Sequence, residues 1–213
     1  MNQPTAAAPP ALIYVIRHGE KPADPPTGNT GVDPSTPSGP SGPPFGVDFQ
    51  GNQDDHSLLP RGWQRSGALA ALFDPATGPL QAGLQVPRTL LSPSYGSTAK
   101  TQVHRTYQTI QGLSERLGVP IVSDYAEGDE PVLASHVVSQ YSGVVLICWE
   151  HDHIPSLASS LPVTAGTAIP QPWPGGRFDV IWTFTLVPGT SQYAFGQIPQ
   201  QLLAGDTDTI ISA

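Results

Sequence analysis

Two pairs of polar residues that could do chemistry follow apolar runs at separate places in the chain. Arg17-His18 comes directly after residues 12–16, and Glu150-His151 comes directly after residues 144–149. Each run has the length and the content of β-branched residues expected of a buried strand. Polar residues that follow the strands of an open α/β sheet can converge at one edge, where ligands bind. The pattern therefore predicts one site that contains both histidines.

The residue types at this predicted site favour an anion as the ligand. Arg17 carries a permanently charged, forked donor, and Gly19 lets a ligand approach the backbone closely. Arg105 begins the stretch Arg105-Thr106-Tyr107-Gln108-Thr109, within a helix predicted from about residue 100 to 117. The site can thus gather two histidines and two arginines around one point.

The elements that must position these residues alternate between strands and helices. Strands are predicted over residues 11–16, 88–92, 119–125, 144–149, 178–187 and 192–198. Helices are predicted over residues 63–73, 100–117, 129–142 and 155–161. This alternation predicts an α/β fold with a mostly parallel sheet. Residues 1–213 are expected to form a single domain, with residues 1–10 as a flexible arm.

A long stretch between residues 22 and 57 is rich in proline and glycine at its start and has few apolar residues. Such a stretch cannot form a packed element. A loop of this length is usually functional or disordered. Because it begins just after His18, a loop bordering the site and a disordered insertion are both retained as interpretations.

Composition limits the classes of partner. The formal net charge is -8 and only 9 residues are Lys or Arg, which argues against general nucleic-acid binding. The N-terminus lacks the features of a secretory signal, and no apolar stretch reaches the roughly 18 residues of a membrane span. We therefore expect no nucleic-acid or membrane partner and a cytoplasmic location. The sequence leaves the oligomeric state open.

Four segments, in order, resemble the histidine phosphatase superfamily, whose members include phosphoglycerate mutases. The first two are Arg17-His18-Gly19-Glu20 and Arg61-Gly62-Trp63-Gln64. The third consists of two stretches, Leu91-Ser92-Pro93 and Arg105-Thr106-Tyr107-Gln108-Thr109, and the fourth is Glu150-His151. The resemblance implies a phosphoglycerate mutase-like fold, a three-layer α/β/α sandwich with a mostly parallel central sheet. The absence of the long insertions found in mutases makes the chain more similar to the small bacterial phosphatases.

The sequence also departs from the family pattern. Residues 94–103 stand as an insertion before the arginine segment, and the loop after Lys21 is unusually long. Asp152 follows His151 where many members carry glycine.

The resemblance implies a phosphatase reaction that fits the residue chemistry. His18 would attack a phosphomonoester and hold the phosphoryl group as phosphohistidine until water releases inorganic phosphate. Arg17, Arg105 and His151 would stabilise the charge that spreads over the phosphoryl oxygens. The substrate would be a small phosphoester, which Gly19, Glu20, Lys21 and Arg61 would help to bind. This chemistry requires no metal and no cofactor.

The leaving oxygen needs a proton, so a carboxylic acid should lie near His18. Glu127, just past the predicted strand 119–125, and Asp152 each correspond to the acid position of one branch of the family. Glu130 is a third candidate, although it also suits the start of a helix. The sequence leaves the choice among the three open.

Two other functions remain as alternatives. His151, Asp152 and His153, with His18 or His136, could bind a divalent metal in a metal-dependent hydrolase. The chain could instead be a non-catalytic module that binds phosphoryl groups. Mutase activity is less favoured than hydrolysis, because the sparsely charged loop after Lys21 does not suggest a closed pocket.

Overall fold

The computed structural model describes residues 8–22, 44–96 and 98–213. Most of the predicted arm and residues 23–43 of the proline- and glycine-rich stretch lie outside the described residues. Within the described part, no helix is long and apolar enough to cross a membrane.

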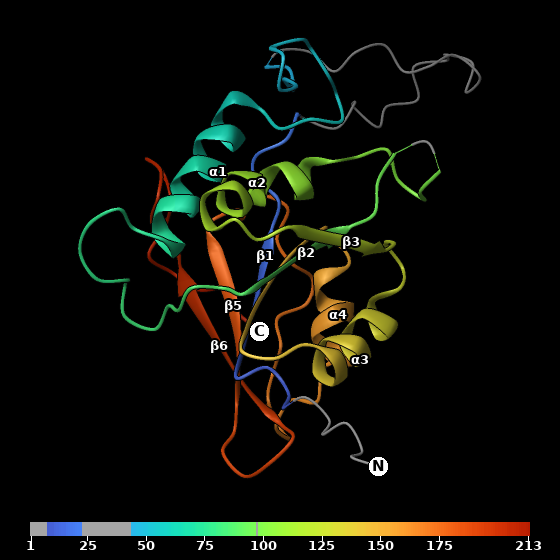
Figure 1. Ribbon diagram of the computed structural model, residues 1–213, viewed down its shortest axis with the longest axis vertical. Coiled ribbons are helices and arrows are strands. Elements are labelled where there is room, and N and C mark those ends of the chain that lie inside the picture. Colours follow the sequence, from blue (N-terminus) through green and yellow to red (C-terminus); the bar gives the residue numbers. More distant parts are fainter. Residues whose placement is uncertain (1–7, 23–43, 97) are drawn as a thin grey trace.

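In the described residues, six strands and four helices form an α/β fold with one mixed sheet, whose helices and strands are labelled in Figure 1. The strands are β1 (Leu12–Arg17), β2 (Thr89–Pro93), β3 (Ile121–Tyr125), β4 (Val144–Trp149), β5 (Val180–Leu186) and β6 (Tyr193–Pro199). The helices are α1 (Pro60–Phe73), α2 (Arg105–Leu117), α3 (Glu130–Gln140) and α4 (Ile154–Ser160). The predicted alternation of strands and helices is therefore confirmed.

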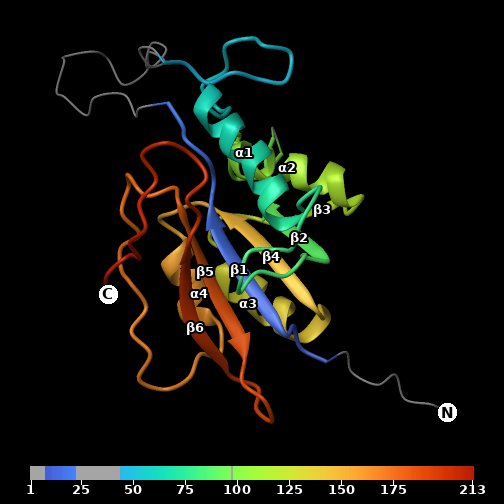
Figure 2. The same ribbon diagram turned by 90° about the vertical axis from the view of Figure 1, so that its left-hand side faces the viewer.

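The strands lie side by side in the order β3-β2-β4-β1-β5-β6 (Figure 2). The first four of these are mutually parallel, whereas β5 pairs antiparallel with β1 and β6 antiparallel with β5. The hairpin that the sequence predicts for the last two strands is thus present. Because β1, β2, β3 and β4 are parallel, their carboxyl ends meet at one edge of the sheet.

Two hydrophobic clusters lie on opposite faces of the sheet. Alternate residues of β1 enter different clusters: Ile13 and Val15 pack with α3 and α4, and Tyr14 and Ile16 pack with α1 and α2. All six residues of β4 are buried, as its continuous apolar run predicts. Burial of both faces fixes the register of the central strands, and with it the positions of the residues that follow them.

Helix α2 begins later than its apolar periodicity indicates. The helix predicted from about residue 100 starts at Arg105, so the predicted start is wrong by more than one turn. The Thr101 carbonyl accepts a hydrogen bond from the N–H of Gly96, and its hydroxyl accepts one from the N–H of Val103. These local bonds hold residues 100–104 in a loop. Arg105 is therefore the first residue of the helix.

Two glycines allow α1 to contact the chain just beyond β1. A Cβ atom at Gly62 would lie 2.6 Å from the carbonyl oxygen of Glu20, and one at Gly19 would lie 3.0 Å from that of Gly62. Real side chains would force the two segments apart. The glycines of the first two motifs thus set the packing of the site.

Candidate active site

The two predicted histidine motifs meet at the carboxyl ends of β1 and β4. Arg17 lies opposite Trp149 in the parallel register, and the N–H of His18 donates to the Trp149 carbonyl at 3.3 Å. The rings of His18 and His151 approach edge to face, with centroids 6.3 Å apart. The predicted convergence of the histidines is confirmed.

The His18 ring is held in one orientation. Its Nδ1 lies 2.6 Å from the carbonyl oxygen of Gly19, which can only accept a hydrogen bond. In the neutral ring Nδ1 therefore carries the hydrogen, and Nε2 presents its lone pair to the site. Burial lowers the pKa of His18 below its ordinary value of 6.5, and Arg17 adds to this effect while Glu150 opposes it. The neutral, nucleophilic form is thus favoured near pH 7.

Backbone carbonyl groups position the guanidinium groups of both arginines. Arg17 is buried, and its Nη1 donates to the carbonyl oxygens of Gly175 at 2.5 Å and Arg177 at 3.2 Å. The Phe178 ring lies beneath the Arg17 guanidinium, at 3.9 Å from its central carbon. At the N-terminus of α2, Arg105 donates to the carbonyl oxygens of Ser57, at 3.3 Å, and Asp55.

Both arginines lie close enough to His18 for their charges to affect its pKa. The positive charges of Arg17 and Arg105 each lower the pKa of His18, after the larger effect of burial. The sheet edge therefore brings together His18, His151 and the two arginines that the sequence analysis selected.

Glu150 is a member of the candidate site that the sequence reasoning did not select. Its Oε1 contacts Nδ1 of His151 and lies 3.8 Å from Nε2 of His18. Its Oε2 accepts the N–H of Asp152 at 2.7 Å. Burial favours the neutral carboxyl, but the hydrogen bond with His151 is the main cause that holds the pKa of Glu150 well below its usual range. The sequence feature that could have identified Glu150 is its position directly before His151.

The structure separates the three candidate acids. Glu130 is buried and accepts hydrogen bonds from Trp149 Nε1 and the Gly128 N–H, both at 2.9 Å, which gives it a structural role. The Asp152 side chain is 76% exposed, and its Oδ1 lies 3.4 Å from Nε2 of His151. Burial, followed by the negative charge of Glu150, raises the pKa of Glu127. A raised pKa is a property that general acids share.

The residues predicted to contact the substrate, Gly19, Glu20, Lys21 and Arg61, have different surroundings in the structure. The Gly19 N–H donates to Thr109 Oγ1 at 2.8 Å, and this bond ties the first motif to α2. Glu20 accepts from Nε of Arg61 at 3.0 Å and from Nη2 of Arg65 at 2.8 Å. Lys21 is half-buried just beyond Glu20. Direct contact of these residues with substrate stays a prediction.

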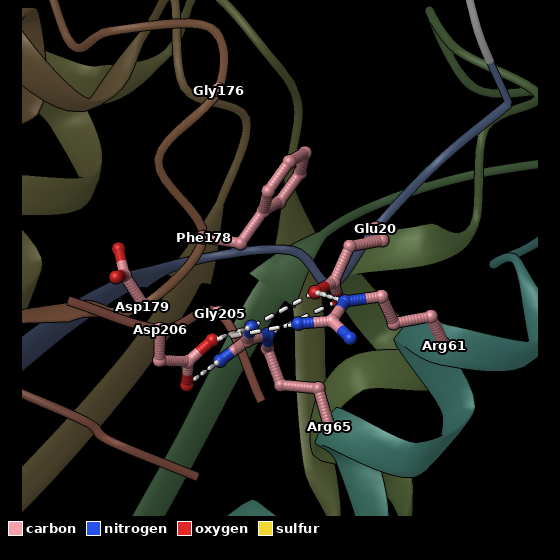
Figure 3. Close-up of a pocket in the computed structure, with 8 residues that line it drawn as sticks. All are labelled: Glu20, Arg61, Arg65, Gly176, Phe178, Asp179, Gly205 and Asp206. Carbon is pink, nitrogen blue, oxygen red and sulfur yellow. Dashed lines mark hydrogen bonds and ion pairs between the residues drawn. The ribbon is translucent and has the colours of Figure 1, made fainter. Parts of the chain in front are cut away.

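Arg65, which the sequence analysis did not select, forms a buried ion-pair network beside the site. Figure 3 shows its guanidinium between the carboxylates of Glu20 and Asp206, with Arg61 and Phe178 nearby. Its nitrogens also donate to Gln200 Oε1 at 2.9 Å and to Asp206 Oδ1 at 2.7 Å. Glu20, Arg61, Arg65, Phe178 and Asp206 line a cavity of about 250 Å³. The network ties the tail after β6 to the segment after His18.

The alternative metal group of the sequence analysis does not assemble as predicted. His153 Nδ1 pairs with Glu130 Oε1 at 3.1 Å, and His136 Nδ1 bonds to the hydroxyl of Tyr125 at 3.0 Å. Within the described residues, the group whose ligand atoms lie within 4.8 Å of one another is His18, Glu150 and His151. In the described residues, His151 and His18 of the alternative set thus lie together with Glu150, whereas Asp152, His153 and His136 are not part of that group.

The candidate site thus presents an oriented imidazole, two guanidinium groups, a second histidine and a carboxyl of raised pKa at one sheet edge. No protein-family model matches the chain, and no curated protein matches it.

Proposed function

We propose that this protein is a phosphatase that hydrolyses a phosphomonoester through a phosphohistidine intermediate on His18, without a metal. The observation that carries the proposal is the orientation of His18, whose Nδ1 is occupied by the Gly19 carbonyl at 2.6 Å, so that Nε2 keeps its lone pair beside the edge-to-face ring of His151. The charges of Arg17 and Arg105 act on the same ring. The four segments that resemble histidine phosphatases support the same reaction. The fold proposed with it is the phosphoglycerate mutase-like sandwich.

In the first step, Nε2 of His18 attacks phosphorus and forms the N–P bond, while the bond to the leaving oxygen breaks. Arg17 and Arg105 neutralise the charge on the phosphoryl oxygens. The leaving oxygen takes the proton of Glu127. The raised pKa of this carboxyl, due first to burial and then to Glu150, keeps it protonated to higher pH than an ordinary glutamate.

In the second step, water attacks phosphorus, gives a proton to the Glu127 carboxylate and displaces the imidazole. Inorganic phosphate leaves and both residues return to their starting states. The carboxyl thus acts once as an acid and once as a base, a cycle suited to a pKa near the working pH.

Inhibitors separate this reaction from metal-dependent hydrolysis. Vanadate, which imitates the trigonal phosphoryl group, is expected to inhibit turnover of p-nitrophenyl phosphate, and prior dialysis against EDTA is expected to leave it unchanged. Loss of activity in EDTA, with recovery on adding back a divalent metal, would contradict the proposal.

Glu127→Gln is expected to lower kcat about 10²- to 10⁴-fold for an alkyl phosphate, the range that general acid catalysis supplies. The effect should be much smaller for p-nitrophenyl phosphate, because its leaving group needs no proton. Since the protonated acid is lost as pH rises through the pKa of Glu127, kcat of the wild type should fall on the alkaline side. The variant should lack this dependence.

The same two substrates and pH series on Asp152→Asn decide between the candidate acids. Because the Asp152 carboxylate is exposed, it should protonate the leaving group little. We therefore expect Asp152→Asn to lower kcat modestly and to the same extent for both substrates. A larger leaving-group effect in Asp152→Asn than in Glu127→Gln would reverse the assignment.

A further inference from the structure

The contact between His18 and Glu150 places two acceptor atoms face to face. Nδ1 of His18 uses its hydrogen on the Gly19 carbonyl, so Nε2 of the neutral ring offers only a lone pair. That lone pair lies 3.8 Å from Oε1 of Glu150, a carboxylate oxygen that also only accepts. Two opposed acceptors are stabilised when a cation lies between them.

A third ligand completes a set that transition metals prefer. His151, Glu150 and His18 each offer one ligand atom, and these atoms lie within 4.8 Å of one another. Two imidazoles and one carboxylate form a common ligand set of catalytic zinc sites, which leaves a fourth position open. Ligand atoms of a tetrahedral zinc with bonds of about 2.0–2.1 Å stand roughly 3.3 Å apart, so small side-chain rotations suffice.

Each of the three ligands is already oriented by a second group. His18 is fixed by the Gly19 carbonyl through Nδ1, and Oε2 of Glu150 accepts the Asp152 N–H at 2.7 Å. Nε2 of His151 lies 3.4 Å from Oδ1 of Asp152, on the far side of the ring from Glu150. Histidine ligands of metals usually donate their second nitrogen to such a carboxylate or carbonyl.

We propose that a divalent transition-metal ion, best represented by Zn²⁺, binds His18, Glu150 and His151 and thereby blocks the phosphoryl site. The ion takes the Nε2 lone pair that would attack phosphorus, so metal and phosphoryl group exclude each other. Binding of the metal stands independently of the proposed function, whereas inhibition rests on it. The nearby guanidinium groups of Arg17 and Arg105 oppose a cation and should keep the affinity below that of a structural zinc site.

Calorimetric titration of the full chain with Zn²⁺, after dialysis against EDTA and in a buffer without phosphate, tests the binding. We expect one ion per chain, and an apparent affinity that falls when vanadate is present. Glu150→Gln, which keeps the shape of the side chain, should weaken zinc binding at least about 10- to 100-fold. A loss of this size is typical even when the changed residue only hydrogen-bonds to a metal ligand. His151→Ala should weaken it similarly.

His136→Gln serves as the matched control, because His136 bonds to Tyr125 away from this site, and its zinc affinity should equal that of the wild type. Absence of binding in the wild type would overturn the proposal, as would binding that survives both Glu150→Gln and His151→Ala. Co²⁺ gives a second readout, since tetrahedral coordination produces strong visible absorption that Glu150→Gln should remove.

Activity assays keep the two proposals distinguishable. Zn²⁺ should inhibit turnover of p-nitrophenyl phosphate in proportion to site occupancy measured by calorimetry. Binding without inhibition would overturn the blocking role. Turnover that requires Zn²⁺ would overturn both the blocking role and the metal-independent reaction.

Discussion

Replacing His18 with alanine is expected to lower kcat for phosphoester hydrolysis by at least about 10³-fold, because removal of a covalent nucleophile eliminates the reaction path. The residual rate should approach the uncatalysed one, since Arg17 and Arg105 cannot form the intermediate. Turnover of p-nitrophenyl phosphate measures the loss. Brief reaction with ³²P-labelled substrate should give an acid-labile adduct in the wild type and none in the variant.

The control for this result is His136→Ala, which removes an imidazole that bonds to the Tyr125 hydroxyl outside the site. Its activity and labelling should match those of the wild type. Because His18 is buried, near-UV circular dichroism must show that its variant is folded. If folded wild type and His18→Ala are equally inert toward a broad panel of phosphoesters, the result contradicts the phosphatase proposal and favours the alternative of a phosphoryl-binding module.

Arg65→Ala is expected to lower the free energy of unfolding by about 3–5 kcal/mol, because removing one partner of a buried ion pair leaves uncompensated charges. The Arg65 side chain is 2% exposed and holds the carboxylates of Glu20 and Asp206. Both would stay buried in the variant with few donors. Urea denaturation of the two proteins measures the difference.

Arg116→Ala is the matched control. Its pair with Asp74 has a similar length of 2.9 Å, but the two side chains are 34% and 38% exposed. Exposed pairs are screened by water and contribute roughly 0–1 kcal/mol. Equal losses in the Arg65 and Arg116 variants would contradict the importance of the buried network.

The pH dependence of stability gives a second check on Arg65. Although burial favours a neutral carboxyl, hydrogen bonds from Arg65 and from the N–H groups of Leu203 and Leu202 lower the pKa of Asp206 to about 2. The unfolded chain then binds more protons than the folded one between that value and the ordinary 3.8. Stability should therefore fall as pH decreases through this window. In Arg65→Ala the decline should be shallower.

Patterns of local sequence were sufficient to predict most of the elements. The apolar run of β4 predicted a central strand, and Gly118 predicted the end of α2, where it adopts a left-handed φ of 64°. Strands that end in Arg17-His18 and Glu150-His151 predicted the meeting of two histidines. Periodicity and capping depend on residues close together in the chain, and the meeting of the histidines follows from the general rule that parallel strands end at one edge of a sheet.

The start of α2 could not be predicted in this way. Val103 continues the apolar stripe of the helix, yet the hydrogen bonds around Thr101 hold residues 100–104 in a loop. The spacing of apolar residues does not show whether residues 100–104 form helical hydrogen bonds or the loop bonds around Thr101. The difference matters, because it places Arg105 at the N-terminus of the helix, beside the carbonyl groups of Asp55 and Ser57.

Residue types and motif order in the sequence determined the chemistry that this chain can offer: an imidazole nucleophile, two arginines and a choice of carboxyls. Only the tertiary structure distinguished the carboxyls, since burial and the charge of Glu150 act through space on Glu127. It alone placed Glu150 between the two histidines and Arg65 between Glu20 and Asp206. These partners are brought together by packing, and no spacing along the chain encodes such distances.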